Sequence, residues 1–146
     1  MKREEKKFVP VMITPFNLKA EVDLDVVSIL IEFYIAAGVK GFFANCLSSE
    51  MFSITEDERI ELTRHVVKKV NSRVPVVATG SFGLTIADKA EFTKKISDTG
   101  IDAAIMITGH FAKEEDSDAL LLRNFEQMFQ LTGNIPLGMY ECPAPY

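Results

Sequence analysis

The sequence contains few cysteines and histidines and no long run of apolar residues. Its two cysteines, Cys46 and Cys142, lie far apart, and neither His65 nor His110 is near a cysteine pair, so no metal-binding spacing is present. No stretch approaches the roughly 20 apolar residues that span a bilayer, and the charged start does not resemble a secretory signal. We therefore expect free thiols, a cytoplasmic location, no bound metal and no membrane partner.

The sequence also lacks an excess of basic residues. Its 16 Lys and Arg are outnumbered by 21 Asp and Glu, which gives a net charge of −5. A nucleic-acid-binding domain needs a basic face, so this balance argues against a nucleic-acid partner. With 146 residues, 47% of them apolar, the chain is long enough to bury a core. We predict a single domain over residues 1–146.

Five short apolar runs punctuate the chain, and each is continuous rather than alternating. They lie at residues 9–13, 41–46, 75–80, 103–108 and 136–140. Continuous apolar runs are typical of parallel strands that are covered on both faces. The four intervals between them have helical spacing, at about residues 26–37, 55–71, 85–98 and 117–131. The predicted order of elements is therefore β-α-β-α-β-α-β-α-β, an α/β pattern.

Two architectures share this α/β pattern. One is a doubly wound open sheet, which would be complete at about this length. The other is a (βα)8 TIM barrel, which normally needs about 250 residues and of which this chain would form the first five strands. In both, the chemistry lies at the C-terminal ends of the strands. The residues there are rich in hydroxyl groups and poor in charge, and they include no glycine-rich nucleotide-binding loop.

The strand ends carry five short motifs. They are V-M-I-T-P-F at residues 11–16, C-L-S-S-E at 46–50, A-T-G-S at 78–81, T-G-H-F at 108–111 and M-Y-E-C-P at 139–143. In this order they resemble the T-P-F, G-T-T-G-E, G-T-G-S, T-P-Y-Y and Y-N-x-P motifs of the dihydrodipicolinate synthase / N-acetylneuraminate lyase family, the pyruvate-dependent class I aldolases. The resemblance covers essentially the whole chain. It implies a (βα)8 TIM barrel of which only about the first five strands and four helices are present.

The resemblance also implies a chemistry. In this family a lysine on the sixth strand forms a Schiff base with pyruvate or another 2-oxo acid, and the iminium serves as an electron sink. No lysine follows Tyr140 in this sequence, so we expect the chain alone to be inactive. Lys113 is the only lysine expected in a rim loop, its acidic neighbours favour its charged form, and the other lysines are expected in solvated positions. We expect a homo-oligomer that takes a small 2-oxo acid and no cofactor.

The matched motifs name the site residues. A phenol at a strand end can donate or accept a proton, and the resemblance implies that Tyr140 is the catalytic residue that relays protons. It implies that Ser48 and Ser49 bind the substrate carboxylate. The residues expected to be structural near the site are Glu50, whose carboxylate would hold loop amides, Thr79 and Gly80. His110, which titrates near neutrality, is a further candidate, whereas His65 is expected at the surface.

Three positions depart from the family pattern. Leu47 stands where a hydroxyl usually hands a proton to the tyrosine, and Phe111 stands where some members have a second tyrosine. Both changes put the usual proton relay in doubt. Pro145 occupies the place of the arginine that grips the second substrate in the synthases, and a proline cannot replace an arginine–carboxylate pair. A sugar-acid aldolase or dehydratase is therefore favoured over a true dihydrodipicolinate synthase.

Two readings from other functional classes stay open. The chain could be a non-catalytic half-barrel module that associates through exposed edge strands. It could also be a complete five-stranded flavodoxin-like binding domain, which the hydroxyl-rich strand ends do not favour. A longer reading frame with a lysine-bearing sixth strand would support the lyase.

Overall fold

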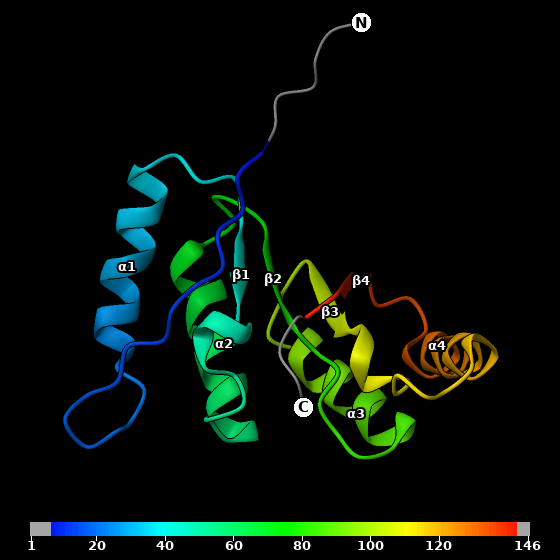
Figure 1. Cartoon of the computed structure of the whole chain (residues 1–146). Coiled ribbons are helices and arrows are strands. Elements are labelled where there is room, and N and C mark those ends of the chain that lie inside the picture. The colour runs from blue at the N-terminus through cyan, green and yellow to red at the C-terminus, as the bar shows by residue number, and fades with distance from the viewer. Residues whose placement is uncertain (1–6, 143–146) are drawn as a thin grey trace, which may run out of the picture. The chain divides into compact units, whose positions relative to one another are not determined.

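Helices and parallel strands alternate along the chain, as the α/β pattern predicts (Figure 1). The computed structural model describes residues 7–142. Its helices are α1 (Leu24–Ala36), α2 (Glu56–Val70), α3 (Ile86–Ser97) and α4 (Asp118–Thr132). Its strands are β1 (Phe42–Ala44), β2 (Val76–Thr79), β3 (Ala103–Ile107) and β4 (Leu137–Tyr140). Short 3-10 turns, Leu47–Ser49 and Thr108–His110, follow β1 and β3.

Side-chain caps fix where the helices begin. Thr55 accepts a hydrogen bond from the Glu58 N–H, and the Glu58 carboxylate accepts one from the Thr55 N–H at 2.7 Å. Thr85 and Asp88 form the same reciprocal pair at the start of α3. These bonds satisfy amides that have no partner inside the helix. They confirm the helix starts that the sequence predicts at these two threonines.

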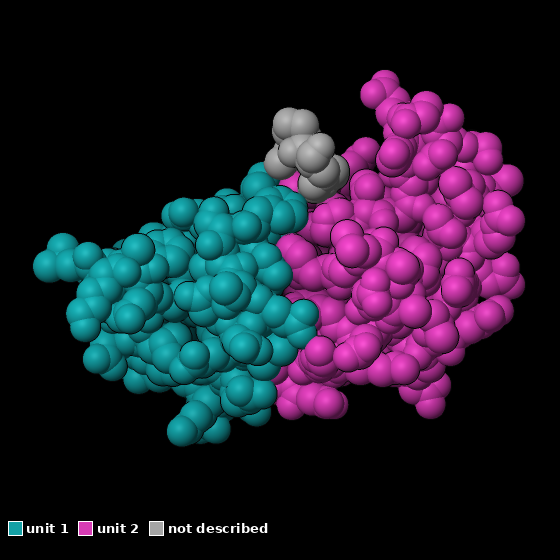
Figure 2. Space-filling view, turned by 90° about the horizontal axis from the view of Figure 1, so that it is seen from below, with its two compact units in different colours: residues 1–76 teal, residues 77–146 magenta. Residues whose placement is uncertain are grey.

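The chain divides after Val76 into two compact units, coloured teal and magenta in Figure 2. The single domain that the sequence predicts over residues 1–146 stays a prediction. In the first unit, Val11 forms a parallel bridge with Phe43 of β1. The Phe42 N–H donates to the carbonyl of Pro75, the residue before β2, at 2.9 Å. A doubly wound order would insert the first strand between the second and third, so these contacts exclude it.

The predicted strand at residues 9–13 is not a regular strand. The Met12 N–H donates to the Phe43 carbonyl and the Phe43 N–H donates to the Pro10 carbonyl, both at 3.0 Å, but only Val11 makes a bridge. Pro10 has no N–H to donate, which shortens any ladder through this segment. The prediction of a regular strand is therefore wrong for residues 9–13, although the segment does lie alongside β1.

Polar contacts join α1 to α2 in the first unit. Ser28 of α1 and Nε2 of His65 are 2.7 Å apart, so His65 is half-buried rather than at the surface as predicted. Arg73 donates two hydrogen bonds to Glu32, at 2.8 and 2.9 Å, and Lys69 lies 3.3 Å from the same carboxylate. The bonds from Arg73, with help from Lys69, lower the pKa of Glu32 to about 2.

In the second unit, β2, β3 and β4 are parallel neighbours in that order. Met106 of β3 is the partner of Met139, and Ile107 is the partner of Tyr140. Met106 is buried in the core beneath α3 and α4, which also contains Ala90, Phe111, Phe125 and Met128. Because successive side chains of a strand point to opposite faces, Tyr140 lies on the face of the sheet opposite α3 and α4.

Within residues 7–142, no helix is long and apolar enough to cross a membrane. The same part of the chain holds no cluster of three or more His, Cys, Asp or Glu side chains arranged for a metal ion.

Candidate functional site

The turn after β1 is held by the side chain of Ser49. Its hydroxyl donates to the Met12 carbonyl at 2.7 Å and accepts from the Cys46 N–H at 3.1 Å. Thr14, from the T-P-F motif, donates to the Ser49 carbonyl at 2.8 Å. These hydrogen bonds join the T-P-F motif to the C-L-S-S-E motif, and Ser49 is fully buried between them.

The neighbours of Ser49 are arranged differently. Ser48 is exposed, and its hydroxyl makes no hydrogen bond within residues 7–142. Glu50 is also exposed, and its carboxylate does not bond the loop amides there, contrary to the expected bond. Its contribution is a left-handed backbone with φ 54°, which ends the turn. Leu47, where the family has a hydroxyl, is half-buried.

Replacing Ser49 tests whether its hydroxyl holds this turn. Ser49→Ala leaves the buried Cys46 N–H and the buried Met12 carbonyl without that partner. A buried polar group without a partner costs about 1–3 kcal/mol, so we expect a loss of about 2–4 kcal/mol in unfolding free energy, measured by urea denaturation. Ser48→Ala is the matched control, since an exposed substitution changes stability by about 0.5 kcal/mol or less. Equal stability of the two variants would contradict this role of Ser49.

The end of β2 is closely packed. Thr79 is fully buried, and its hydroxyl has no hydrogen-bond partner in the described part of the chain. At Gly80 a Cβ would lie 2.9 Å from the Cβ of Ala104 and 3.3 Å from Cγ2 of Ile96. The Gly80 carbonyl accepts a hydrogen bond from Thr93 of α3 at 2.7 Å. A side chain at this position would therefore crowd β3 and α3, and the role of Gly80 near the site stays a prediction.

His110 bonds to the segment that follows β2. Its Nδ1 lies 2.6 Å from the Ser81 carbonyl and 3.3 Å from the Ser81 hydroxyl. The carbonyl can only accept, so Nδ1 carries the proton. The His110 ring also packs edge-on against Phe82, with centroids 5.9 Å apart. Burial lowers the pKa of His110 below its ordinary value of 6.5, the bond to Ser81 opposes this, and the nearby charge of Lys89 adds to the lowering.

This lowered pKa predicts a pH dependence of stability. In the unfolded chain the imidazole binds a proton more readily than in the folded chain. Stability should therefore be unaffected by His110 above its ordinary pKa and should fall as the pH drops below it. Urea denaturation at several pH values should show a smaller fall for His110→Gln than for the unsubstituted chain. An NMR titration of the His110 ring that gave a pKa at or above 6.5 would contradict the prediction.

Tyr140 ends β4 and is half-buried. The Thr108 hydroxyl, from the T-G-H-F motif, donates to the Tyr140 carbonyl at 3.5 Å, a long bond. Phe111 of the same motif is buried and stacks on Phe125 of α4, with ring centroids 4.6 Å apart. The ring that replaces a family tyrosine is therefore part of the core.

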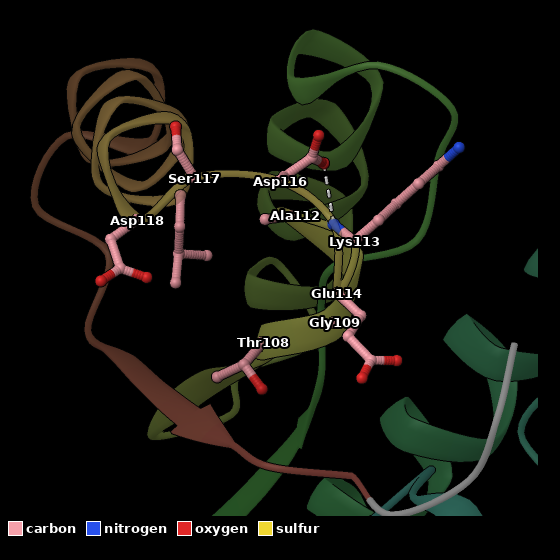
Figure 3. Close-up of a pocket in the computed structure, with 9 residues that line it drawn as sticks. Thr108, Gly109, Ala112, Lys113, Glu114, Asp116, Ser117 and Asp118 are labelled. Atoms are coloured by element: carbon pink, nitrogen blue, oxygen red, sulfur yellow. Dashed lines mark hydrogen bonds between the residues drawn. The ribbon is translucent and has the colours of Figure 1, made fainter.

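A pocket of about 270 Å³ lies between the turn after β3 and the start of α4 (Figure 3). Thr108 and Lys113 line it together with the carboxylates of Glu114, Asp116 and Asp118. The Lys113 side chain extends away from Ser117 and Asp118 in Figure 3, and its backbone N–H donates to Asp116 at 2.9 Å. A pocket lined by three carboxylates does not suit an anionic 2-oxo acid.

One lysine is not solvated as the sequence predicts. Lys89 of α3 is only 6% exposed, and its Nζ donates to the carbonyls of Gly83 at 2.9 Å and Leu84 at 3.2 Å. Burial lowers the pKa of Lys89. The sequence could have indicated this burial, because the spacing of Lys89, Thr93 and Ile96 places them on one face of the helix, and the other two are buried.

The predicted site residues thus fall into two groups. Ser48, Ser49 and Glu50 belong to the first unit, and Thr79, Gly80, His110 and Tyr140 belong to the second. The structure joins Thr14 to Ser49 in the first group and links the turn after β3 to Ser81 and Tyr140 in the second.

The sequence matches a family of known proteins over almost its whole length. The model of the dihydrodipicolinate synthetase family matches residues 4–144. A 4-hydroxy-tetrahydrodipicolinate synthase from Halalkalibacterium halodurans is 33% identical over 134 residues, which are 91% of this chain and 44% of the relative. The corresponding synthase of Bacillus subtilis is 30% identical over 133 residues, with the same coverage of 91% and 44%. The chain therefore spans less than half the length of these relatives.

Solved structures agree with this match. A dihydrodipicolinate synthase from Bacillus anthracis superposes with a TM-score of 0.81 at 26% identity, covering 94% of this chain and 46% of that one. YagE, a prophage protein of the dihydrodipicolinic acid synthase family from Escherichia coli K12, was solved in complex with pyruvate. It gives a TM-score of 0.81 at 27% identity and covers 94% of this chain and 45% of its own.

Proposed function

Because the chain belongs to the dihydrodipicolinate synthetase family, we propose that it forms the N-terminal part of a Schiff-base lyase acting on pyruvate or another 2-oxo acid. The observation that carries this proposal is the match from residue 4 to residue 144, which includes all five strand-end motifs. The pyruvate complex of YagE supports the substrate class. The chain lacks the Schiff-base lysine, and the remaining part of the family fold must supply it.

We propose Tyr140 as the catalytic proton carrier. Tyr140 lies at the end of β4, on the sheet face opposite α3 and α4. This position supports the role, because the side chain does not pack beneath the helices. A phenol there can pass a proton to or from the alkoxide formed when a carbon–carbon bond is made or broken.

The turn after β1 is proposed to hold the substrate carboxylate. Ser48 supports this through its exposed hydroxyl, which can donate to an anion. Ser49, predicted as a second binding residue, uses its hydroxyl inside the turn, so its proposed part is to hold Ser48 in place. Glu50, Thr79 and Gly80 are proposed as structural neighbours of this site.

His110 is proposed as a positioning residue. Its proton on Nδ1 holds the turn after β3 against Ser81, at the end of β2. This places it between two strand ends whose loops carry site motifs. The protonated nitrogen is engaged with a carbonyl, which favours holding the two loops over proton transfer from that atom.

The proposed substrate class follows from Pro145, which lies outside the described residues. Proline in place of the synthase arginine supports a sugar-acid aldolase or dehydratase, although the curated relatives are named synthases. We expect the enzyme completed by the C-terminal part of the fold to turn over a sugar acid, or pyruvate together with a sugar aldehyde, faster than the substrates of the synthase reaction. The opposite ranking would assign the synthase reaction instead.

The second candidate function is a non-catalytic half-barrel module. Exposed apolar side chains at Val9, Val11 and Ile13 favour this function, because such a surface tends to associate with other chains. Borohydride trapping with pyruvate in the presence of the C-terminal part of the fold separates the two, since only a completed lyase forms an imine that the reagent fixes. The expected homo-oligomer is part of the proposal, and native mass spectrometry of the assembled enzyme tests it.

A further inference from the structure

Lys89 is the only charged side chain that is buried within residues 7–142. It lies near the start of α3, close to the positive end of the helix dipole, where a positive charge is disfavoured. No carboxylate in that part of the chain forms an ion pair with it. Buried lysines are rare without an ionic partner, so neither local helix chemistry nor charge pairing accounts for a lysine here.

The Lys89 ammonium group holds the segment between β2 and α3. Its Nζ donates to the Gly83 carbonyl at 2.9 Å and to the Leu84 carbonyl at 3.2 Å. No other group in the described part of the chain donates to either carbonyl. Gly83 has φ 136°, and a Cβ there would lie 2.7 Å from the Cβ of Asp88, so the segment packs tightly against the start of α3. We call residues 81–84 the β2–α3 segment.

The other end of the β2–α3 segment bonds to the candidate site. The Ser81 hydroxyl accepts from the Ile107 N–H at 2.9 Å, and the Ser81 carbonyl accepts from Nδ1 of His110 at 2.6 Å. Ile107 is the residue of β3 that pairs with Tyr140 of β4. The β2–α3 segment therefore contacts the residue that lies beside the proposed proton carrier.

We propose that Lys89 is a positioning residue for Tyr140: it fixes the β2–α3 segment, which holds Ile107 and with it the end of β4. The role of Tyr140 in proton transfer is taken from the proposed function, on which this proposal rests. Lys89 has no part in the reaction itself, because its Nζ is engaged with two carbonyls. It acts through Ser81 and Ile107, and a reacting group displaced by about 1 Å can lose about 10²-fold in rate.

Proton exchange in the 146-residue chain tests whether Lys89 fixes the β2–α3 segment. Lys89→Met keeps a long unbranched side chain and removes the donors. Measured by NMR, the His110 Nδ1 proton and the Ile107 amide proton should exchange with water about tenfold faster or more, because both acceptors belong to this segment. Lys94→Met, at an exposed lysine of the same helix, is the matched control and should leave both rates unchanged.

Gly83→Ala displaces the same segment and leaves Lys89 in place. A Cβ at this position meets Asp88, and φ of 136° strains an alanine. We expect the same two protons to exchange faster in this variant. Circular dichroism shows which variants are folded. A folded Lys89→Met or Gly83→Ala chain in which both protons exchange at the unsubstituted rate overturns the proposal.

Turnover tests the step from the β2–α3 segment to Tyr140. In the enzyme completed by the C-terminal part of the fold, we expect Lys89→Met to lower kcat by about ten- to a hundredfold and Lys94→Met to leave it unchanged. Expressing kcat per mole of borohydride-trapped pyruvate adduct removes the contribution of unfolded enzyme, which is all that a purely structural role would change. Faster proton exchange with unchanged kcat overturns the proposal. A completed unsubstituted enzyme that forms no adduct contradicts the proposed function alone, because the exchange measurements do not depend on it.

Discussion

Borohydride reduction of the 146-residue chain in the presence of pyruvate is expected to leave its mass unchanged. A Schiff base forms when an unprotonated amine attacks a keto group, and enzymes obtain that amine by placing a lysine in a desolvated pocket that opens to the substrate. No lysine in the described part of the chain combines both properties. We therefore expect this chain alone to form no imine with pyruvate, in contrast to the enzyme completed by the C-terminal part of the fold.

Two lysines come closest to the properties that a Schiff-base nucleophile needs. Lys113 lines the pocket beside α4 but is exposed, and its side chain extends away from Ser117 and Asp118 (Figure 3). Lys89 is buried, and burial lowers its pKa, but its Nζ donates to two carbonyls in the turn before α3. Reaction at Lys89 would break both bonds.

Intact-mass spectrometry after reduction measures the outcome. An aldolase that forms a pyruvate imine serves as the positive control for the reagent. A stable pyruvate adduct on one specific lysine of the 146-residue chain would contradict the expectation. Lys89→Arg keeps a charge and donors at that position, so loss of such an adduct in this variant would identify Lys89 as the nucleophile.

Tyr140→Phe should have the second large effect, in the enzyme completed by the C-terminal part of the fold. Removing the phenol hydroxyl removes the proposed proton carrier and leaves the ring. General acid–base catalysis contributes about 10²- to 10⁴-fold, so kcat should fall by about that factor. Imine formation needs the lysine, so the borohydride adduct should still form.

Tyr34→Phe is the matched control, because Tyr34 lies on α1 and packs against Phe42 in the core of the first unit. Its kcat should stay within about twofold of the unsubstituted enzyme. If Tyr140→Phe kept full turnover, the proton-carrier role would be wrong. If it lost the adduct and turnover together, Tyr140 would be needed for binding instead.

The sequence was most informative where local chemistry decides the structure. Helices α2 and α3 begin at Thr55 and Thr85, where the sequence predicts helix starts, and reciprocal side-chain bonds to Glu58 and Asp88 hold these starts. The order of strands and helices follows from the apolar runs, since each run is long enough for one buried strand. The segment at residues 9–13 fell short because Pro10 has no amide proton.

The sequence was less informative about what individual polar side chains do. The spacing places Ser48 and Ser49 in one turn, but only the fold shows that the second hydroxyl reaches the Met12 carbonyl. His65 meets Ser28 from a helix 37 positions away, a contact that no local pattern encodes. The Lys89 ammonium group donates hydrogen bonds to two carbonyls of an irregular turn, and these contacts also depend on the fold.

Mapping the pyruvate adduct in the completed enzyme tests the central claim most directly. The chain is combined with the C-terminal part of the fold, treated with pyruvate and borohydride, digested and analysed by mass spectrometry. We predict a single modified lysine, located outside residues 1–146. A modified lysine within residues 1–146, or a fully assembled complex with no modified lysine at all, would contradict the assignment of this chain to the N-terminal part of a Schiff-base lyase.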